Sequence, residues 1–224
     1  HIYTDSYIST IGVDFKINAL KNVQLYGQLL LDEFVFSEVT HYNRGSWVNK
    51  QALQLGAKYI DAFTIKNLDL QVEANIIRPF VYSHLDSITS NFSNYNQPLA
   101  DPLGAHVKEY IAIARYQLIP KLFFAGKLIY YRQGLDSAGL NFGGNIFKGY
   151  NVGRTSDYGF HTGDGIPVKC LYASLNVSYE LFNNLFIDAN AVYRTYHEAG
   201  KANQNLFMYS AGLRMNIQRR VFEF

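Results

Sequence analysis

Two pairs of carboxylates are the first residues in this sequence that could do chemistry. Glycoside hydrolases use two carboxylates placed on either side of the bond that they cleave. Asp32 and Glu33 are adjacent, and neighbouring residues of a strand point to opposite faces, so they cannot flank one bond. Asp69 and Glu73 share a face, but that face carries many other charges. We therefore expect no catalytic residues and a protein that is not an enzyme.

Metal and nucleotide chemistry have equally little support in the sequence. Cys170 is the single cysteine, so it has no disulfide partner, and we expect an inert strand position. The glycine-rich stretch 134–167 has neither a phosphate-binding glycine motif nor the spacing of a calcium loop. We expect no cofactor and no metal. The six histidines lack the spacing of a metal site, and we expect solvated side chains in or beside loops: His1, His41, His84, His106, His161 and His197.

Nine segments with alternating polar and apolar residues supply the elements that position these groups. Each is roughly 10–14 residues long, whereas strands of soluble proteins average about 5–6 residues and tilted membrane strands need about 9–11. The sequence therefore predicts an all-β protein. The segments are 8–18, 22–34, 50–62, 68–80, 106–118, 121–133, 168–180, 184–196 and 204–220.

Short and long connections alternate strictly along the chain. The short ones are 19–21, 63–67, 119–120 and 182–183, and the others are mostly long and polar: 35–49, 81–105 and 134–167, with a shorter one at 197–203. Outer-membrane barrels have short periplasmic turns and longer extracellular loops. We thus expect one domain over residues 1–224, an antiparallel transmembrane β-barrel with the three long linkers on the outside.

The composition agrees with this class and excludes others. Aromatic residues make up 16% of the chain, and charged residues only 17%, below the roughly 25% of an average soluble domain. No run approaches the ~18 apolar residues of a membrane helix. The formal net charge of +2 gives no reason to expect a nucleic-acid partner.

One face of each predicted strand is apolar and the other is polar. Membrane barrels place the apolar face against lipid and the polar face in the lumen. A soluble antiparallel sheet with one solvated face alternates in the same way, so the pattern alone leaves both open. We expect a charge network in the lumen, formed by Asp69, Glu73, Arg78, Glu109, Arg115, Lys127, Asp188, Arg194 and Arg214, with Asp14, Lys16, Gln54, Lys58 and Glu180 on the same side.

Aromatic residues near the strand ends favour the membrane alternative. Outer-membrane barrels carry aromatic girdles at both lipid–water interfaces. Phe34, Phe36, Phe80, Tyr82, Tyr130, Tyr131, Tyr193 and Tyr196 flank the long linkers, and Phe63, Phe123, Phe182 and Phe186 flank the short turns. The terminal Phe224 resembles an outer-membrane assembly signal.

Counting strand directions gives an incomplete barrel. If the short turns are periplasmic, the first and ninth strands both run toward the periplasm. A complete bacterial barrel has an even number of strands with both termini in the periplasm. We therefore expect further strands N-terminal to these nine. The sequence also starts without the features of a signal peptide, so upstream sequence is expected for export.

A stretch in the second long linker carries a family resemblance. Asn94 to Tyr110 reads NYNQPLADPLGAHVKEY, and the segments VQLYGQLLLDEF at 23–34, QVEANIIRPF at 71–80 and GGNIF at 143–147 add to it. These residues resemble the Wzi-like capsule-assembly proteins of the Bacteroidota, a group that includes the gliding-motility protein RemB. Asp101 departs from that motif, in which we expect histidine, and this leaves the role of position 101 open.

The resemblance implies an eighteen-stranded barrel, of which the nine strands would be the C-terminal half. It also implies an integral protein of the bacterial outer membrane with a lectin-like role in attaching capsule or exopolysaccharide. The linkers interleave aromatic residues with Asn, Asp and Arg, which suits either sugar stacking or an ordered lid over the barrel mouth. Our candidate glycan contacts are Tyr95, Asn96, Gln97, Asn145, Tyr150 and Arg154.

Three functions remain open from the sequence. The first is non-enzymatic polysaccharide assembly or attachment, or motility-associated organisation of the surface. The second is a barrel subunit of a larger export or gliding complex, and the third is a diffusion porin. The expected partners are outer-membrane lipids, with surface polysaccharide for the first function and other complex subunits for the second.

Overall fold

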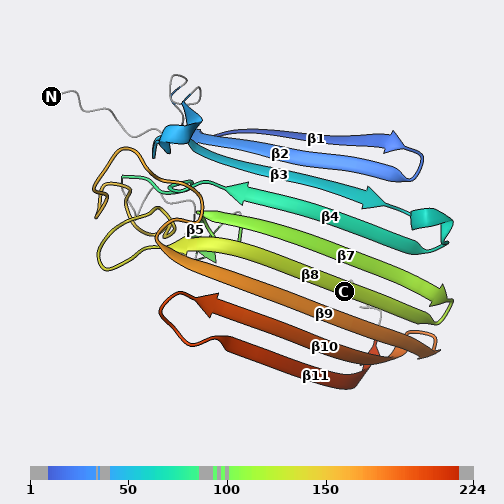
Figure 1. Cartoon of the computed structure of the whole chain (residues 1–224). Coiled ribbons are helices and arrows are strands. Elements are labelled where there is room, and N and C mark those ends of the chain that lie inside the picture. The colour runs from blue at the N-terminus through green and yellow to red at the C-terminus, as the bar shows by residue number, and fades with distance from the viewer. Residues whose placement is uncertain are drawn as a thin grey trace, which may run out of the picture.

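The computed structural model describes residues 10–33, 35, 41–85, 93–94, 97–98 and 101–216, and its main element is one antiparallel sheet (Figure 1). The nine long strands pair in chain order, each with the next. Their bounds are β1 (Ile11–Leu20), β2 (Val23–Glu33), β3 (Lys50–Tyr59), β4 (Leu68–Ile77), β7 (Val107–Ile119), β8 (Leu122–Leu135), β9 (Ile166–Phe182), β10 (Leu185–Glu198) and β11 (Gln204–Met215). The predicted all-β, antiparallel class is confirmed.

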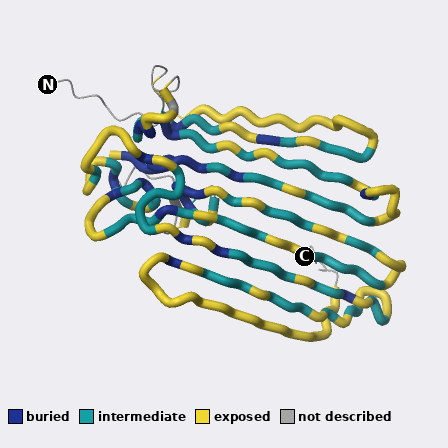
Figure 2. Tube along the Cα trace, viewed as in Figure 1, coloured by how far each residue is buried: buried dark blue, intermediate teal, exposed yellow. Residues whose placement is uncertain are grey.

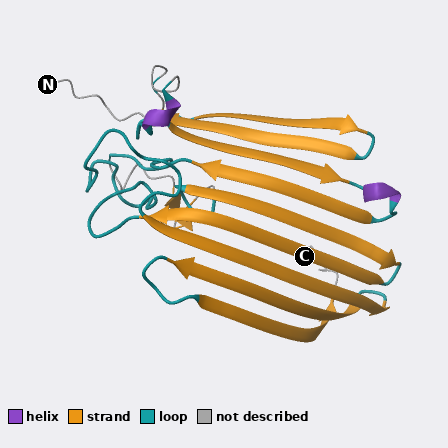
Figure 3. Ribbon diagram, viewed as in Figure 1, coloured by secondary structure: helices purple, strands orange, loops and turns teal. Residues whose placement is uncertain are grey.

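The sheet is open over the described residues, with β1 and β11 at its two edges. The remaining elements are short: the β5–β6 pair (Ser93–Asn94 and Gln97–Pro98) and two single-turn 3-10 helices, η1 (Tyr42–Arg44) and η2 (Ala62–Thr64). Figure 3 shows η1 and η2 at opposite ends of the strands. In the part of the chain that the structure describes, no helix is long and apolar enough to span a bilayer.

All nine predicted strands are present, but two end earlier than the alternation indicated. β3 stops at Tyr59 because Asp61 and Phe63 have positive φ angles of 49° and 56°, which form the turn containing η2. β4 stops at Ile77, directly before Arg78-Pro79, because the proline ring disfavours strand pairing and lacks an amide donor. The predicted ends 8–9, 34 and 217–220 lie outside the described residues.

The predicted alternation of connections is confirmed. Two-residue turns join β1 to β2, β7 to β8 and β9 to β10, and η2 lies in the turn between β3 and β4. Figure 1 shows these turns at one end of the sheet and the long linkers gathered at the other. β1 and β11 therefore run in the same direction, toward the turns.

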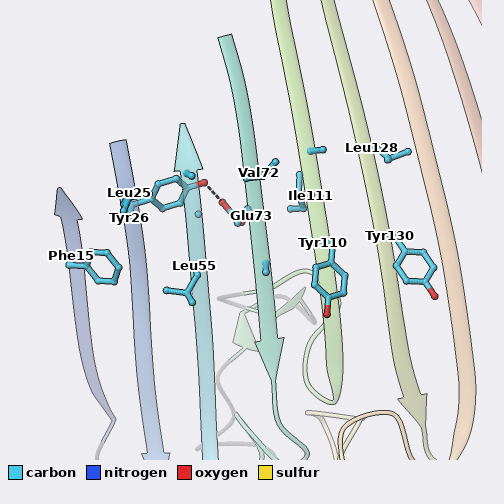
Figure 4. Close-up of a pocket in the computed structure, with 14 residues that line it drawn as sticks. Phe15, Leu25, Tyr26, Leu55, Val72, Glu73, Tyr110, Ile111, Leu128 and Tyr130 are labelled. Atoms are coloured by element: carbon cyan, nitrogen blue, oxygen red, sulfur yellow. Dashed lines mark hydrogen bonds between the residues drawn. The ribbon is translucent and has the colours of Figure 1, made fainter. Parts of the chain in front are cut away.

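The strand register separates the side chains into an apolar face and a polar face. Phe15, Leu55, Val72, Leu128 and other residues of the apolar face project from one side of successive strands (Figure 4). They line an open depression of about 580 Å³. Many apolar side chains on this face are exposed, from Val13 on β1 through Leu175 on β9 to Tyr209, which is 82% exposed, on β11.

The long linkers fold together into a structure that we call the loop cap, formed by residues 41–49, 78–85, 101–106 and 136–165. Its core consists of Val81, Tyr82, Ala105 and Ile146, which pack with Ile77 and Val107 at the strand ends. Leu30 and Ala52 also contact this core and belong to the polar face. The cap therefore covers the loop end of the polar face, where Figure 2 shows most of the buried residues.

Close backbone contacts hold the cap together. The amide of Phe80 donates to the carbonyl of Gly143 at 2.9 Å. Gly143 has a φ of 79°, and a Cβ there would lie 2.4 Å from the Phe80 nitrogen. Only glycine fits this position without displacing the backbone.

The predicted aromatic girdles are largely wrong. Phe80 and Tyr82 are buried in the loop cap, because they supply its apolar core. Tyr131, Tyr196, Phe123 and Phe186 share the polar face with Glu109 and Glu180, to which the register joins them. Phe63, Phe182, Tyr130 and Tyr193 are not buried, with Phe182 71% exposed, and Phe34 and Phe36 lie outside the described residues.

Candidate functional site

A cavity of about 540 Å³ lies where the loop cap meets the polar face of the sheet. Strands β2, β3, β4, β7 and β8 supply its floor, and the cap supplies Tyr82, Asp101 and Pro102. The floor combines amide and carboxylate groups with apolar side chains in similar numbers: Gln28, Leu30, Ala52, Leu53, Gln54, Glu73, Asn75, Ile77, Glu109, Ile111, Lys127 and Ile129. This mixture can bind a ligand with many hydroxyl groups, because carboxylates accept hydrogen bonds and amides both donate and accept them.

Glu73 is the centre of the hydrogen-bond network beside the cavity. Its carboxylate accepts from the Tyr26 hydroxyl at 2.6 Å, from Gln54 Nε2 at 2.9 Å and from Asn75 Nδ2 at 3.1 Å. Figure 4 shows Tyr26 reaching Glu73 from β2, two strands away from β4. The Tyr26 ring occupies the place of a side chain at Gly56 on β3, and a Cβ there would lie 2.2 Å from the ring. Gly56 thus permits a hydrogen bond that spans an intervening strand.

Asn75 links Glu73 to the next carboxylate and keeps one group free. Its Nδ2 donates to Glu109 Oε2 at 2.9 Å as well as to Glu73. Its Oδ1 is buried and has no hydrogen-bond partner among the described residues. A buried acceptor without a donor costs free energy, on the order of 1–3 kcal/mol.

Burial shifts the pKa values of two side chains on the cap side of the cavity. Burial raises the pKa of Asp101, and nearby Glu73 raises it further, whereas the hydrogen bond from the Leu103 amide to its carboxylate lowers it. Burial also raises the pKa of Tyr82 to about 12, helped by Asp101 and Asp32. Tyr82 is therefore neutral at physiological pH. Asp101 lines the same cavity as Glu73 and Glu109.

The predicted charge network is divided into separate groups. Glu73 and Glu109 are joined through Asn75, as described, and Lys127 lines the same cavity. Asp188 and Arg214 form an ion pair with Nε and Oδ2 2.7 Å apart. Asp188 also accepts from Ser178 Oγ at 2.5 Å.

The other predicted members lie apart from these two groups. Arg194 contacts the Tyr196 ring at 5.1 Å and interacts with Tyr131 and Cys170, which is buried. Asp69 and Arg115 are register partners on β4 and β7, but they form no ion pair within the described residues. Arg78 lies beyond the end of β4 in the cap, where its guanidinium donates to the Ser46 carbonyl at 3.2 Å.

Two of the predicted glycan contacts meet in the cap, around a tryptophan. Tyr150 packs against Trp47 with ring centroids 4.6 Å apart, and the Arg154 guanidinium lies 4.1 Å from the centre of the Trp47 ring. Arg154 Nε donates to the Tyr150 carbonyl at 3.1 Å, and Asp157 accepts from both Arg154 and Trp47 Nε1. These rings thus stabilise the cap by packing on one another, in agreement with the lid interpretation.

The remaining predicted glycan contacts do not join this cluster. Asn145 is exposed, and its Oδ1 accepts from the Phe147 amide at 2.9 Å in a local turn. Gln97 is exposed on β6. Tyr95 and Asn96 lie outside the described residues. Sequence reasoning overlooked Trp47, although its being the single tryptophan of the chain was a signal.

A buried lysine connects the cap to the sheet and was also missed. Lys50, fully buried, donates to the Ser83 carbonyl at 2.7 Å and lies 2.9 Å from Glu33 Oε2. Its ammonium group is 4.6 Å from the centre of the Tyr150 ring, a favourable cation–π distance. Lys50, the first residue of β3, therefore binds residues of two linkers and the last residue of β2.

Asp32 and Glu33 converge instead of pointing apart, so our argument from strict alternation is wrong for this pair. The β2–β3 register shifts between Leu31 and Glu33, and both carboxylates approach His84, at 3.7 Å and 3.9 Å. Asp32 also accepts from the Tyr82 amide at 3.2 Å, which is a structural role in the cap.

The expectation of solvated histidines is wrong for His84 and His106, which are buried in the cap. Burial lowers the pKa of both side chains. His106 Nε2 lies 2.9 Å from the carbonyl oxygen of His161 and 3.1 Å from the amide nitrogen of Asp164, so His106 is held by the backbone of the last linker. No group of three or more His, Cys, Asp or Glu side chains in the described ranges could hold a metal ion.

The comparisons with known proteins leave the family open. No protein-family model matches this chain. No curated protein matches it either. Function must therefore be argued from the two faces of the sheet and from the cavity.

Proposed function

We propose that this chain is the membrane-spanning part of an outer-membrane β-barrel that holds surface polysaccharide on the cell and performs no catalysis. The observation that carries this proposal is the difference between the two faces of the sheet, one apolar and exposed, the other polar and partly covered by the cap. No described residue packs over the apolar face, whereas the cap and the polar cavity lie on the other face. Large exposed apolar surfaces mark membrane or partner contacts, and alternating strands of 10–17 residues are long enough to cross a bilayer.

The edges of the sheet support a larger barrel. Within the described residues, β1 and β11 each have one side without a pairing partner, and long exposed edge strands invite association with other strands. Because both run toward the turns, an all-antiparallel barrel needs an odd number of additional strands between them. Nine more strands, as the Wzi-like resemblance implies, satisfy this condition.

The polysaccharide part of the proposal is supported by the cavity. It offers carboxylates and amides beneath a cap that is anchored by Lys50. Such a lining suits the hydroxyl groups of a glycan. The cap also favours attachment over diffusion, because it covers the mouth end of the polar face.

The test is polysaccharide retention by cells that carry cavity variants in the full-length protein. Asn75→Ala and Glu109→Ala should each release surface polysaccharide into the medium, with barrel levels in the membrane unchanged. Asn190→Ala is the matched control, since Asn190 bonds Asn176 on the same face, at 2.6 Å, but does not line the cavity. Retention unchanged by both cavity variants would contradict the polysaccharide role.

Conductance in planar bilayers separates attachment from a diffusion porin. The capped barrel should pass little current, and a variant that loosens the cap should pass more. Large steady conductance in the unmodified protein would favour the porin. Co-purification of the barrel with the same partner subunits from native membranes would instead favour a subunit of a larger complex.

A further inference from the structure

Four basic side chains form a row on the apolar face, near its loop end, and we call them the basic row. They are Lys108 on β7, Arg132 on β8, Lys169 on β9 and His197 on β10. The register makes each the direct neighbour of the next: Lys108 faces Arg132, Arg132 faces Lys169, and Lys169 faces His197. All four are exposed. With strands about 4.8 Å apart, the row spans roughly 14 Å.

No described carboxylate neutralises the positive charges of Lys108, Arg132 and Lys169. Neither Lys108, Arg132 nor Lys169 forms an ion pair with any residue that the structure describes, whereas Lys50, Lys201 and Arg214 each have a carboxylate partner. His197 bonds only to the neutral Asn203 side chain among the described residues. Like charges directly opposite each other on neighbouring strands are destabilising. An arrangement of this kind therefore favours an external anion.

The position of the row indicates what kind of anion. On the turn side, the next residues of this face are Tyr110, Tyr130, Leu171 and Thr195, followed by the exposed apolar residues Leu128 and Tyr193. On the loop side, Gly134 and Pro167 are uncharged as well. The basic row thus lies at the boundary where an apolar band ends, with tyrosines just below it. Tyrosine favours the lipid–water interface of a bilayer.

We propose that the basic row binds the phosphate groups of an anionic lipid in the leaflet on the loop side of the membrane. This inference rests on the proposed membrane insertion through the apolar face. The ammonium and guanidinium groups supply the charge, and Arg132 in the middle can bind phosphate with two parallel hydrogen bonds. The acyl chains would lie along the apolar band below. The row is confined to β7–β10, so bound lipid occupies this side of the barrel in preference to β2–β4.

The test uses the full-length protein in detergent micelles, titrated with lipid A that carries two phosphates and followed by native mass spectrometry. Arg132→Gln and Lys169→Gln should each weaken binding about fivefold, and the double variant by more than tenfold. Lys121→Gln is the matched control: it removes the same charge from the exposed turn at the other end of β7 and β8. Dephosphorylated lipid A should bind the unmodified protein and all four variants equally weakly.

The arms of this experiment separate the possible failures. If inorganic phosphate at equal concentration displaces lipid A completely, the site recognises free anions and the lipid assignment is wrong. If Lys121→Gln weakens binding as much as Arg132→Gln, the effect is one of net charge and the basic row is not a site. Membrane insertion is checked separately, by resistance of the protein to alkaline extraction. Loss of insertion would contradict the proposed function, whereas normal insertion with unchanged lipid binding overturns only this inference.

Discussion

The two faces of the sheet differ in how specific their side-chain contacts are. On the apolar face, Leu175, Tyr193, Phe207 and their neighbours are exposed and interchangeable in chemistry, and their role is to match an apolar environment. On the polar face, Glu73, Asn75 and Glu109 form specific hydrogen bonds, and the cap closes over them. In the proposed function, the apolar face contacts the membrane and the polar face binds the ligand. The predictions below test that contrast, from the largest expected effect to the smallest.

An arginine on each face should give the greatest difference. Leu175→Arg places a charge on the apolar face of β9, and Val192→Arg places the same charge on the polar face of the neighbouring β10. An arginine facing the middle of the bilayer costs about 2–4 kcal/mol in a membrane barrel. We expect Leu175→Arg to abolish most assembly, seen as loss of the heat-modifiable band on gels, with Val192→Arg close to normal. Equal effects of the two would mean that lipid does not contact the apolar face.

The stability of the cap should decrease when a side chain is added at Gly143. Gly143→Ala and Gly139→Ala both put a side chain at a positive φ, of 79° and 87°. That strain costs about 1–2 kcal/mol in each. Only Gly143→Ala adds a clash with the Phe80 backbone, since no atom lies within 4 Å of a Cβ at Gly139. Proteolysis of the cap should therefore accelerate far more in Gly143→Ala, and similar rates would show that the Phe80 contact is unimportant.

The buried histidines predict that acid loosens the cap. Burial lowers the pKa of His106 below the value of about 6.5 that it has in an unfolded chain, so the folded cap binds this proton less readily. Cap stability is thus complete above about pH 6.5 and is lost as the pH falls toward the lowered pKa. His84 acts in the same direction, whereas Asp101, with its raised pKa, acts in the opposite one.

Hydrogen exchange of the cap amides at pH 7.5 and pH 5.5, corrected for intrinsic rates, measures this effect. Protection should decrease at the lower pH, and His106→Gln should reduce the decrease. Protection that does not change down to pH 5 would contradict the account of the buried histidines.

The strand pattern made most of the fold predictable, because alternation is a local property that each residue expresses independently. The sequence could not show where this pattern is broken by non-local contacts. The register shift beside Leu31 brings Asp32 and Glu33 together at His84, and no local signal marks that shift. The local pattern also does not predict that Phe80 and Tyr82 are buried, because their burial depends on Gly143 and Ile146, more than 60 positions away.

The candidate site was predicted only in part for the same reason. Glu73, Glu109 and Lys127 were identified from their face, but the cavity exists because the cap residues Tyr82, Asp101 and Pro102 close over them. Tyr150 and Arg154 were identified from their chemistry, and Trp47, which unites them, comes from a different linker. Contacts between linkers determine the site, and a single sequence carries little signal of such contacts.

The ion pair between Asp188 and Arg214 should contribute least of the contacts tested. Arg214 is on the edge strand β11 and nearly half of its side chain is exposed, so solvent screens the pair. We expect Arg214→Ala to leave the free energy of unfolding almost unchanged. Urea unfolding in micelles, with Asp188→Ala as the partner variant, measures this, and a large loss of stability would show that solvent does not screen the pair.

The most direct test of the central claim is the lipid accessibility of spin labels placed along β9. Cys170 is first replaced by alanine, and single cysteines are then introduced from Ala173 to Ser178 for labelling in bilayers. The account predicts collisions with oxygen, which dissolves in lipid, at Ala173, Leu175 and Val177, and collisions with a water-soluble relaxant at Ser174, Asn176 and Ser178. The same accessibility at all six positions, or the opposite phase, would contradict a sheet whose apolar face meets the membrane.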